Sequence, residues 1–419
     1  MKTRLRIVVG GLLGLYPVGG WHYVQYLLGL SRLGHDVYYH EDTWMWPYHP
    51  IEKTYTPDGD YSAKYIRDFL SVYAPELCEN WHYLHLHETS YGMPRSEFDE
   101  VCRSADIFLN VGGGCTIPEE LSPNCVKVII DTDPGYNQIV LTELFDWSEN
   151  AERWRDSVAA HDRFLTYAEN IHSPECLIPK LGFKWKTTRP PVVPDLWEDI
   201  ARVTPSVTTP WTTIMSWNVF KGRLLYQGVE YKSKGSEFEK LMDLPRLTGA
   251  PLKVGVGGVS TEFRWFERHG WQSAARACSF VARARTFKRL ARNGWQVVDG
   301  PHVTKTPAQY RDFIANSRGE ISPAKHVYVA MRSGWFSERS VCYLAAGRPV
   351  IVQDTGFRSV LPTGEGLLVF ASLEEAADAV RKVEMAYARH AKAAKAIAIE
   401  CFGSDRVLQR LTDNVLSKA

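Results

Sequence analysis

Short apolar runs alternate with amphipathic segments along this 419-residue chain, and most of the runs end in a glycine-containing or polar loop. In the first half, the runs lie at residues 6–9, 36–40, 105–111, 126–130 and 164–167. The spacing of Trp21, Val24, Leu27 and Leu30 predicts a helix over 21–33 that ends at Gly34. Buried strands separated by helices are typical of a parallel sheet covered on both faces.

The second half repeats this pattern after a proline-rich break. The break has prolines at positions 190, 191, 194, 205 and 210, which indicates a linker. Further strands are predicted over 212–216, 252–256, 295–298 and 349–353, helices over 307–316 and 337–346, and an inserted hairpin within 218–234. We therefore predict an α/β fold with two doubly wound, Rossmann-like domains, 1–190 and 212–372, joined by the linker 191–211 and followed by helices over 373–419.

The composition narrows the class of protein. Apolar residues make up 45% and charged residues 23%, as in ordinary globular proteins. The net charge of +1 argues against a sequence-general nucleic-acid binder, so we expect no nucleic-acid partner. The eight cysteines form no C-x-x-C pair, which indicates free thiols and a cytoplasmic location. No uninterrupted apolar run approaches ~18 residues, so we expect no transmembrane segment.

Glycine loops follow predicted strands in both halves, for example at Gly10, Gly20, Gly113, Gly114 and Gly257. Doubly wound sheets bind ligands beyond the carboxyl ends of their strands, where glycine lets a ligand approach the backbone. Two such domains facing one another would enclose a central cleft. Tight turning of the chain is the alternative reason for each loop.

The stretch 333–357 predicts an anion site. Ser337 is a suitable N-cap for a helix that Gly347 ends, and free N–H groups at a helix start favour anions. Arg332 and Arg339 flank this start, which suits a diphosphate. Glu338 would face away or accept hydrogen bonds from sugar hydroxyls.

The run YLAAGRPVI at 343–351 resembles the E-A-x-A-x-G-x-P-V segment of GT-B glycosyltransferases of the group-1, family-4-like set. In that set, glutamates that bind the donor occupy the places held here by Cys342 and Gly334. The departure puts the details of donor binding and a retaining mechanism in doubt, and Glu338, Arg339 and Ser340 could take over those contacts. The resemblance implies the GT-B fold, with a last helix that returns to the N-terminal domain.

A second resemblance concerns the Lys-Gly pair that meets the donor diphosphate in these enzymes. Lys221 and Lys234 are both candidates here, and Lys234 is favoured because a helix begins there. The resemblance also places Asp299 near the nucleobase, and Asp354, Thr355 and Gly356 near the sugar. The implied donor-binding set is Lys221, Lys234, Asp299, Glu320, Lys325, Arg332, Ser337, Glu338, Arg339, Ser340, Asp354, Thr355 and Gly356.

The N-terminal domain would hold the acceptor near Gly20, Trp21, Gly113 and Gly114. His22, Asp131 and Asp133 are the candidates for the catalytic base, because each follows a predicted strand. Asp131-Thr132-Asp133 also matches the metal-binding D-x-D of the GT-A fold. It lies in the acceptor half, however, so we expect neither a metal nor a cofactor. Tryptophans such as Trp21, Trp44, Trp46 and Trp335 would suit stacking on sugar rings.

These observations predict a glycosyltransferase that moves a sugar from a nucleotide-diphosphate sugar to an acceptor hydroxyl without a metal. A GT-B-type nucleotide-sugar epimerase and a catalytically silent sugar- or nucleotide-binding protein remain the alternatives. A Rossmann dehydrogenase fits less well, because the loop with Gly10, Gly11 and Gly14 is not a G-x-G-x-x-G motif. The donor base, sugar, acceptor and oligomeric state stay open.

Overall fold

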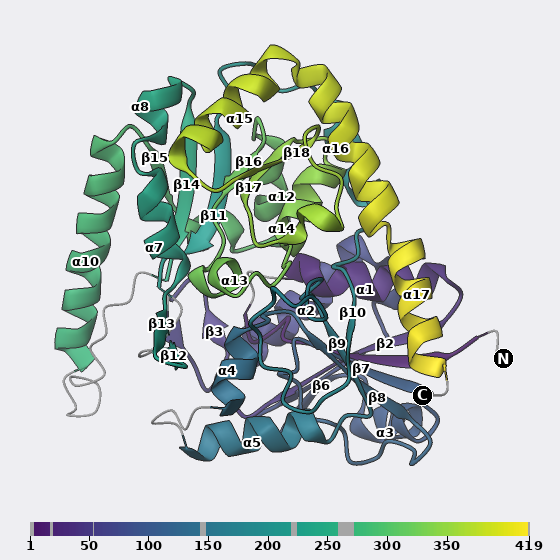
Figure 1. Cartoon of the computed structure of the whole chain (residues 1–419). Coiled ribbons are helices and arrows are strands. Elements are labelled where there is room, and N and C mark those ends of the chain that lie inside the picture. Colours follow the sequence, from purple (N-terminus) through teal and green to yellow (C-terminus); the bar gives the residue numbers. More distant parts are fainter. Residues whose placement is uncertain are drawn as a thin grey trace.

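Two main sheets organise the chain, one in the lower and one in the upper half of Figure 1. The computed structural model describes residues 4–16, 20–52, 54–142, 148–218, 224–258 and 272–417. The N-terminal sheet has the order β10-β9-β8-β7-β1-β2-β5-β6, and all its pairs are parallel except β5 with β6. Its strands are β1 (Arg6–Gly10), β2 (Asp36–Thr43), β5 (Trp81–His85), β6 (Thr89–Gly92), β7 (Ile107–Val111), β8 (Val126–Asp131), β9 (Arg163–Thr166) and β10 (Trp185–Thr187).

The C-terminal sheet has the order β15-β14-β11-β16-β17-β18, with every pair parallel. Its strands are β11 (Trp211–Ser216), β14 (Leu252–Gly257), β15 (Gln296–Asp299), β16 (Glu320–Ser322), β17 (Val350–Gln353) and β18 (Leu367–Phe370). In each sheet the chain builds outward from a central strand on one side and then on the other. The doubly wound architecture predicted from the sequence is therefore confirmed in both halves.

Helices connect the parallel strands, as the crossover rule requires. In the first half these are α1 (Gly20–Arg32), α2 (Asp60–Tyr73), α3 (Arg95–Arg103), α4 (Tyr136–Thr142) and α5 (Ser148–Ala159). In the second half they are α7 (Lys234–Phe238), α8 (Leu244–Thr248), α10 (Gln272–Arg292), α11 (Gly300–Thr304), α12 (Pro307–Ala315), α13 (His326–Ala330) and α14 (Glu338–Ala345). Two small hairpins, β3 (Tyr48–His49) with β4 (Thr54–Tyr55) and β12 (Leu224–Tyr226) with β13 (Val229–Tyr231), branch from this frame.

The sequence patterns missed β5, β6, β10, β16 and β18. β5 reads WHYLH and is buried at every position, so it shows neither alternation nor a purely apolar run. β16 has three residues and begins with the buried Glu320, which no hydrophobic pattern can reveal. The segment between the sheets is partly helical, with a short 3-10 helix at Pro194–Trp197 followed by α6 (Glu198–Ala201). The domain boundaries at 190 and 212 stay a prediction; the sheets span 6–187 and 211–370.

The C-terminal helices join the two halves. α15 (Leu373–Met385) packs beside β18, and α16 (Tyr387–Phe402) and α17 (Ser404–Leu416) run down one side of the molecule (Figure 1). α17 packs against α1 of the first half, where Gly29 leaves room for Leu408 and Ser404. None of the described helices combines the length and apolar character needed to cross a bilayer.

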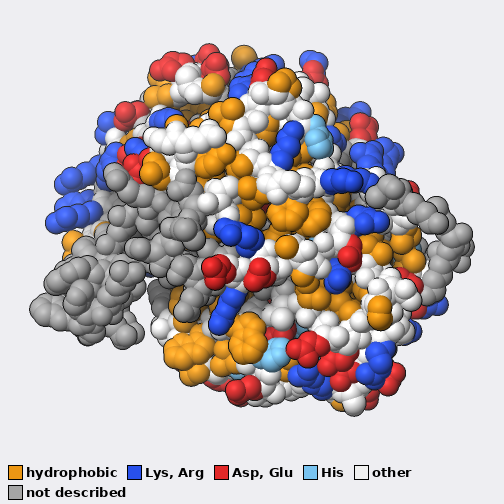
Figure 2. Space-filling view, turned by 60° about the horizontal axis from the view of Figure 1, so that its bottom comes forward, with side chains coloured by type: hydrophobic (Ala, Val, Ile, Leu, Met, Phe, Trp, Pro, Cys, Tyr) orange, Lys and Arg blue, Asp and Glu red, His pale blue; other side chains and the backbone are white. Residues whose placement is uncertain are grey.

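The surface is mixed in charge. On the face shown in Figure 2, Lys and Arg side chains lie in separate places among acidic, apolar and neutral ones. The described part of this face therefore carries no continuous basic surface of the kind that neutralises nucleic-acid phosphates.

We expect Gly29→Ala to lower the free energy of unfolding by about 1–3 kcal/mol, the usual cost of overpacking. An added Cβ would lie 2.5 Å from Leu408 Cδ1 and 2.7 Å from Ser404 Cβ, so α1 and α17 would have to separate. Urea unfolding measures the change. Ser31→Ala on the same helix is the control and should stay within about 0.5 kcal/mol of the natural protein. Equal stability of the two variants would contradict this account of the α1–α17 contact.

Candidate functional site

A cavity of about 1120 Å³ lies between the two sheets, at the carboxyl ends of their strands. This is the position in which doubly wound sheets bind ligands, and the volume is ample for a small organic molecule. Both halves contribute to the wall. The lining residues are Tyr16, Trp21, His22, Gln25, Met45, Trp46, Tyr48, Tyr55, Tyr136, Pro191, Ile214, Met215, Ser216, Asn218, Gly257, Gly258, Gly300, Pro301, Thr304, Tyr310, Glu338, Arg339 and Cys342.

Arg339 marks the point on the C-terminal side where the strand order reverses. The chain leaves β11 toward β14 on one side and later returns as β16 on the other. The guanidinium of Arg339 bridges these two strands: it donates to the carbonyl of Ile214 over 3.0 Å, to Glu320 Oε1 over 2.6 Å and to Ser322 Oγ over 2.9 Å. The neighbouring Glu320 raises the pKa of Arg339, so the cation is permanent.

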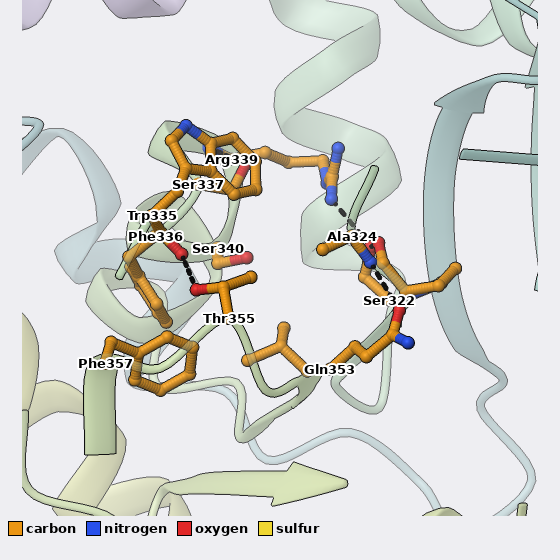
Figure 3. Close-up of a pocket in the computed structure, with 12 residues that line it drawn as sticks. Ser322, Ala324, Trp335, Phe336, Ser337, Arg339, Ser340, Gln353, Thr355 and Phe357 are labelled. Carbon is orange, nitrogen blue, oxygen red and sulfur yellow. Dashed lines mark hydrogen bonds between the residues drawn. The ribbon is translucent and has the colours of Figure 1, made fainter. Parts of the chain in front are cut away.

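The N-terminus of α14 sits over the same junction. The Ser337 side chain accepts a hydrogen bond from the backbone N–H of Arg339 and caps the helix, as the sequence predicts. Figure 3 shows Ser337, Arg339 and Ser340 on one side of a small pocket, with Ser322 and Gln353 opposite. The helix dipole and the Arg339 charge therefore act at one edge of the main cavity.

Lys234, at the start of α7, brings a second basic side chain to this junction, beside the guanidinium of Arg339. Its Nζ donates to Ser322 Oγ over 2.7 Å, so Ser322 accepts hydrogen bonds from both Lys234 and Arg339. Burial and the Arg339 charge lower the pKa of Lys234 well below its ordinary value. A bound anion would offset both effects, since it would attract the ammonium form. The arrangement is therefore suited to a phosphate or diphosphate.

Several other predicted donor residues hold loops together. Thr355 Oγ1 donates to the carbonyl of Trp335 over 2.7 Å, and Asp354 accepts from Gly356 N–H and from Arg358, both over 2.8 Å. Asp299 pairs with Arg283 at the end of β15. Lys221 lies outside the described residues. None of Asp299, Asp354, Thr355 and Gly356 lines the main cavity.

Arg332 does not flank the helix start as the sequence suggested. Its backbone has φ 48°, and its side chain turns away to pair with Glu175 over 2.9 Å. Lys325 likewise points to the other half of the molecule, where it pairs with Asp133. Neither residue lines the cavity, and each is paired with a carboxylate, whereas Lys234 contacts Ser322 beside Arg339.

The two places that hold glutamates in the resembling family have a structural explanation. Gly334 has φ 75°, and a Cβ there would lie 2.8 Å from the backbone nitrogen of Asn170. A glutamate would therefore strain the backbone and push the two halves apart. Cys342 is buried and lines the cavity wall, one turn after Glu338. Glu338 is the carboxylate that α14 offers to the cavity.

His22 is the predicted base that reaches the cavity. It lies in the first turn of α1, and its Nε2 is buried with no hydrogen-bond partner among the described residues. Burial lowers the pKa of His22 below its ordinary 6.5, while Glu338 across the cavity raises it in part. The imidazole is therefore neutral at pH 7 and can accept a proton. Trp21 beside it donates from Nε1 to the carbonyl of Pro307 over 3.0 Å, which links α1 to α12.

The two aspartates are engaged elsewhere. Asp131 is buried and accepts hydrogen bonds from Asn137 over 2.6 Å, Gln138 over 2.7 Å and Thr166 over 3.0 Å. Asp133 binds Lys325 and Tyr328 of the other half. Neither aspartate lines the cavity, and the described contacts of both are with protein groups. Among the described residues, no cluster of three or more His, Cys, Asp or Glu side chains is placed to hold a metal ion.

The glycines predicted to lie near the acceptor are in close contact with neighbouring side chains, which leave no room for a Cβ. An added Cβ at Gly20 would lie 2.3 Å from Phe69 Cε1, and one at Gly114 would lie 2.7 Å from Leu12 Cδ1. Gly113 has φ 73° and packs against Trp154 and Ile129. None of the three lines the cavity. The N-terminal side of the cavity consists of larger side chains from α1, from the β3–β4 hairpin and from the chain just before it. The aromatic run TWMWPY after β2 was the available signal for this hairpin, and of its tryptophans Trp46 lines the cavity.

The loop after β1 is shaped by a buried carboxyl. Glu41 accepts from the backbone N–H of Gly14 over 2.7 Å and of Leu15 over 2.6 Å, and from the Tyr39 hydroxyl over 2.5 Å. Burial raises the pKa of Glu41 to about 7, although these hydrogen bonds lower it in part. The loop leads directly to Tyr16 at the cavity wall.

Comparison with solved structures identifies the fold. No family model matches the sequence, and no curated protein matches it either. An alpha-glucosyltransferase in complex with UDP superposes over 99% of this chain and 100% of its own, with TM-score 0.55 and 12% identity. Anabaena HepE in complex with UDP and glucose gives 99% and 100%, TM-score 0.53 and 13% identity. The sucrose-phosphate synthase of Thermosynechococcus elongatus gives 99% and 98%, TM-score 0.51 and 11% identity. The chain therefore has the GT-B fold, as its motifs predicted.

We expect the free energy of unfolding to fall as pH rises from about 4.5 to about 7, because folded Glu41 keeps a proton that the unfolded chain releases. Glu41→Gln should remove this contribution, on the order of 3 kcal/mol across the window. Urea unfolding at pH 4.5 and pH 8 measures it. Other titrating groups cancel in the difference between variant and natural protein. Parallel pH curves for the two would show that Glu41 does not carry this linkage.

Proposed function

We propose that this protein is a glycosyltransferase that moves a sugar from a nucleotide-diphosphate sugar to an acceptor hydroxyl held by the N-terminal half. One observation carries the proposal. Lys234 and Arg339 share Ser322 beneath the N-terminus of α14; Arg339 lines the cavity between the two sheets of the GT-B fold, and Lys234 is buried directly behind it. Cations and helix N–H groups at this point would stabilise the diphosphate as it leaves.

Side chains of this protein would supply the base and the charges that the proposed sugar transfer needs. The neutral His22 would take the proton of the acceptor hydroxyl at Nε2 as the acceptor oxygen attacks the anomeric carbon. The bond from that carbon to the diphosphate oxygen breaks, and the nucleoside diphosphate departs with the electron pair. Lys234 and Arg339 would hold the negative charge that develops on it. Glu338, across the cavity from His22, is placed to accept a hydrogen bond from a sugar hydroxyl.

We propose further that no metal takes part, so that a chelator leaves activity unchanged. The oxygens of Asp131 already accept from amide and hydroxyl donors, and Asp133 already binds Lys325. The described thiols, Cys102 and Cys115 among them, are free, which supports a reducing, cytoplasmic compartment. The silent-binder alternative gains if a nucleotide binds but neither transfer nor donor hydrolysis is seen.

Lys234→Met tests the diphosphate platform. The nucleotide used is the one of UDP, GDP and ADP that raises the melting temperature of the natural protein. We expect it to bind the variant about 10- to 100-fold more weakly, because a charge-assisted hydrogen bond to phosphate is lost. Without nucleotide, the variant should be equally stable or more stable, because burial disfavours the ammonium. Thermal shift and calorimetry measure both quantities.

The control for this experiment is Arg332→Ala. Arg332 was also a candidate for the diphosphate, but it pairs with Glu175 away from the cavity, so its loss should leave nucleotide affinity unchanged. Arg339→Ala is a poorer test, because it leaves the buried Glu320 without its ion-pair partner and should destabilise the fold by about 3–5 kcal/mol. A Lys234→Met protein that keeps full nucleotide affinity would remove the basis of the proposal.

His22→Ala tests the base. We expect kcat to fall by about 10²- to 10⁴-fold with nucleotide affinity unchanged. In the natural enzyme, kcat should hold as pH drops below 6.5 and decline only at the lowered pKa of His22, where the imidazole becomes protonated. Steady-state rates of transfer or of donor hydrolysis between pH 4.5 and 8 check both points. Loss of activity in Asp133→Asn, with normal activity in His22→Ala, would move the base to Asp133.

A further inference from the structure

The side of the cavity formed by the first half of the chain, where the acceptor is proposed to bind, is lined mainly by aromatic side chains. Six side chains of the first half form what we call the aromatic wall: Tyr16, Met45, Trp46, Tyr48, Tyr55 and Tyr136. Four of them come from the β3–β4 hairpin and the chain just before it. The wall is open to solvent at its rim, where Trp46 is 52% exposed and Tyr55 is 51% exposed. Exposed aromatic side chains gathered at a cavity mouth indicate a binding surface.

The wall is held in place before any ligand arrives. Tyr48 donates its backbone N–H to the carbonyl of Leu15 over 2.9 Å, so the hairpin is fixed to the loop that Glu41 shapes. The rings of Tyr48 and Tyr55 meet edge to face at 5.5 Å. The phenol of Tyr55 also lies close to that of Tyr16, so that burial and this neighbour together raise the pKa of Tyr16. A preorganised wall loses little freedom when it binds.

The wall carries no charge. Among the described residues of the first half that line the cavity, none is Asp, Glu, Lys or Arg. The charged lining residues, Glu338 and Arg339, belong to the opposite side. Burial raises the pKa of Tyr16 and of Tyr136 to about 12, so both phenols stay protonated and can donate hydrogen bonds. Among the described residues, the cations beside the wall are already paired: Lys325, 5.8 Å from the Tyr136 ring, with Asp133, and Arg283 near Tyr48 with Asp299. An acidic acceptor would have to compete with these carboxylates, and a nucleic acid would need several cations.

We infer that the acceptor is a neutral oligosaccharide whose sugar rings stack on the aromatic wall; this inference rests on the proposed transferase function. A sugar ring has an apolar face and a polar edge, which the ring faces and the hydroxyls of the tyrosines match. A lipid chain would leave those hydroxyls without partners. The wall extends from the cavity to the exposed rim at Trp46 and Tyr55, so it offers stacking surface to more than one sugar unit.

Trp46→Ala, with Trp44→Ala as the matched control, tests the inference. Trp44 is the same residue type two positions away and is more exposed at 62%, but it stacks on His87 at 4.6 Å and does not line the cavity. Neither change removes a buried group, so both proteins should fold. The probes are maltohexaose, cellohexaose and chitohexaose as neutral glycans, hexagalacturonate as an acidic one, and phospholipid vesicles. Calorimetry and tryptophan fluorescence measure binding to the full chain.

We expect at least one neutral hexasaccharide to bind, with affinity at least tenfold weaker in Trp46→Ala and within twofold of the natural protein in Trp44→Ala. UDP affinity should be the same in all three proteins. Binding of none of the neutral glycans, binding of only hexagalacturonate or vesicles, or an equal loss in both variants would each overturn the inference. If neutral glycans bind in this Trp46-dependent way but no nucleotide does, the transferase proposal fails and the glycan surface stands.

Discussion

The buried ion pair between Arg339 and Glu320 fixes the geometry on which the candidate site depends. Glu320 is fully buried, and Arg339 reaches past it to the carbonyl of Ile214 and to Ser322. One side chain therefore ties the start of α14 to the carboxyl ends of β11 and β16. Buried pairs of this kind contribute little net stability, but removing one partner is costly. The pair positions a helix terminus and a permanent cation at the strand-order reversal, where a doubly wound sheet receives its ligand.

The two sides of the cavity carry different kinds of side chain. The C-terminal side presents Arg339, Glu338 and the helix dipole, with Lys234 beneath them, whereas the N-terminal side presents His22 and an uncharged aromatic wall. The proposed transfer, with an anionic leaving group and a neutral acceptor, would use these two environments. Burial lowers the pKa of His22, and the carboxylate of Glu338 partly offsets this effect.

Polar contacts between the halves set the width of the cavity. Asp133 of the first half binds Lys325 and Tyr328 of the second, and Trp335 Nε1 donates to the carbonyl of Thr132 over 3.1 Å. Asn170 Nδ2 donates to the carbonyl of Gly356 over 2.8 Å. Lys325 and Gly356, which were predicted to lie near the donor, thus take part in contacts between the two halves. Spacing in the sequence cannot separate such a structural role from a role in binding.

The sequence by itself determined the doubly wound architecture, the helix cap at Ser337 and the returning C-terminal helix, because each follows from local periodicity, capping or a motif. Only the tertiary structure decided which of the candidate site residues come together at the cavity. Asp131, Asp133 and His22 all lie at or beyond the end of a strand, yet only His22 lines the cavity. The two carboxylates are bound by other groups, Asp131 by Asn137, Gln138 and Thr166 and Asp133 by Lys325. The short strand that carries Glu320 and the hairpin that follows Trp46 also required the fold, because buried charge and exposed aromatic side chains do not fit the hydrophobic pattern from which strands are predicted.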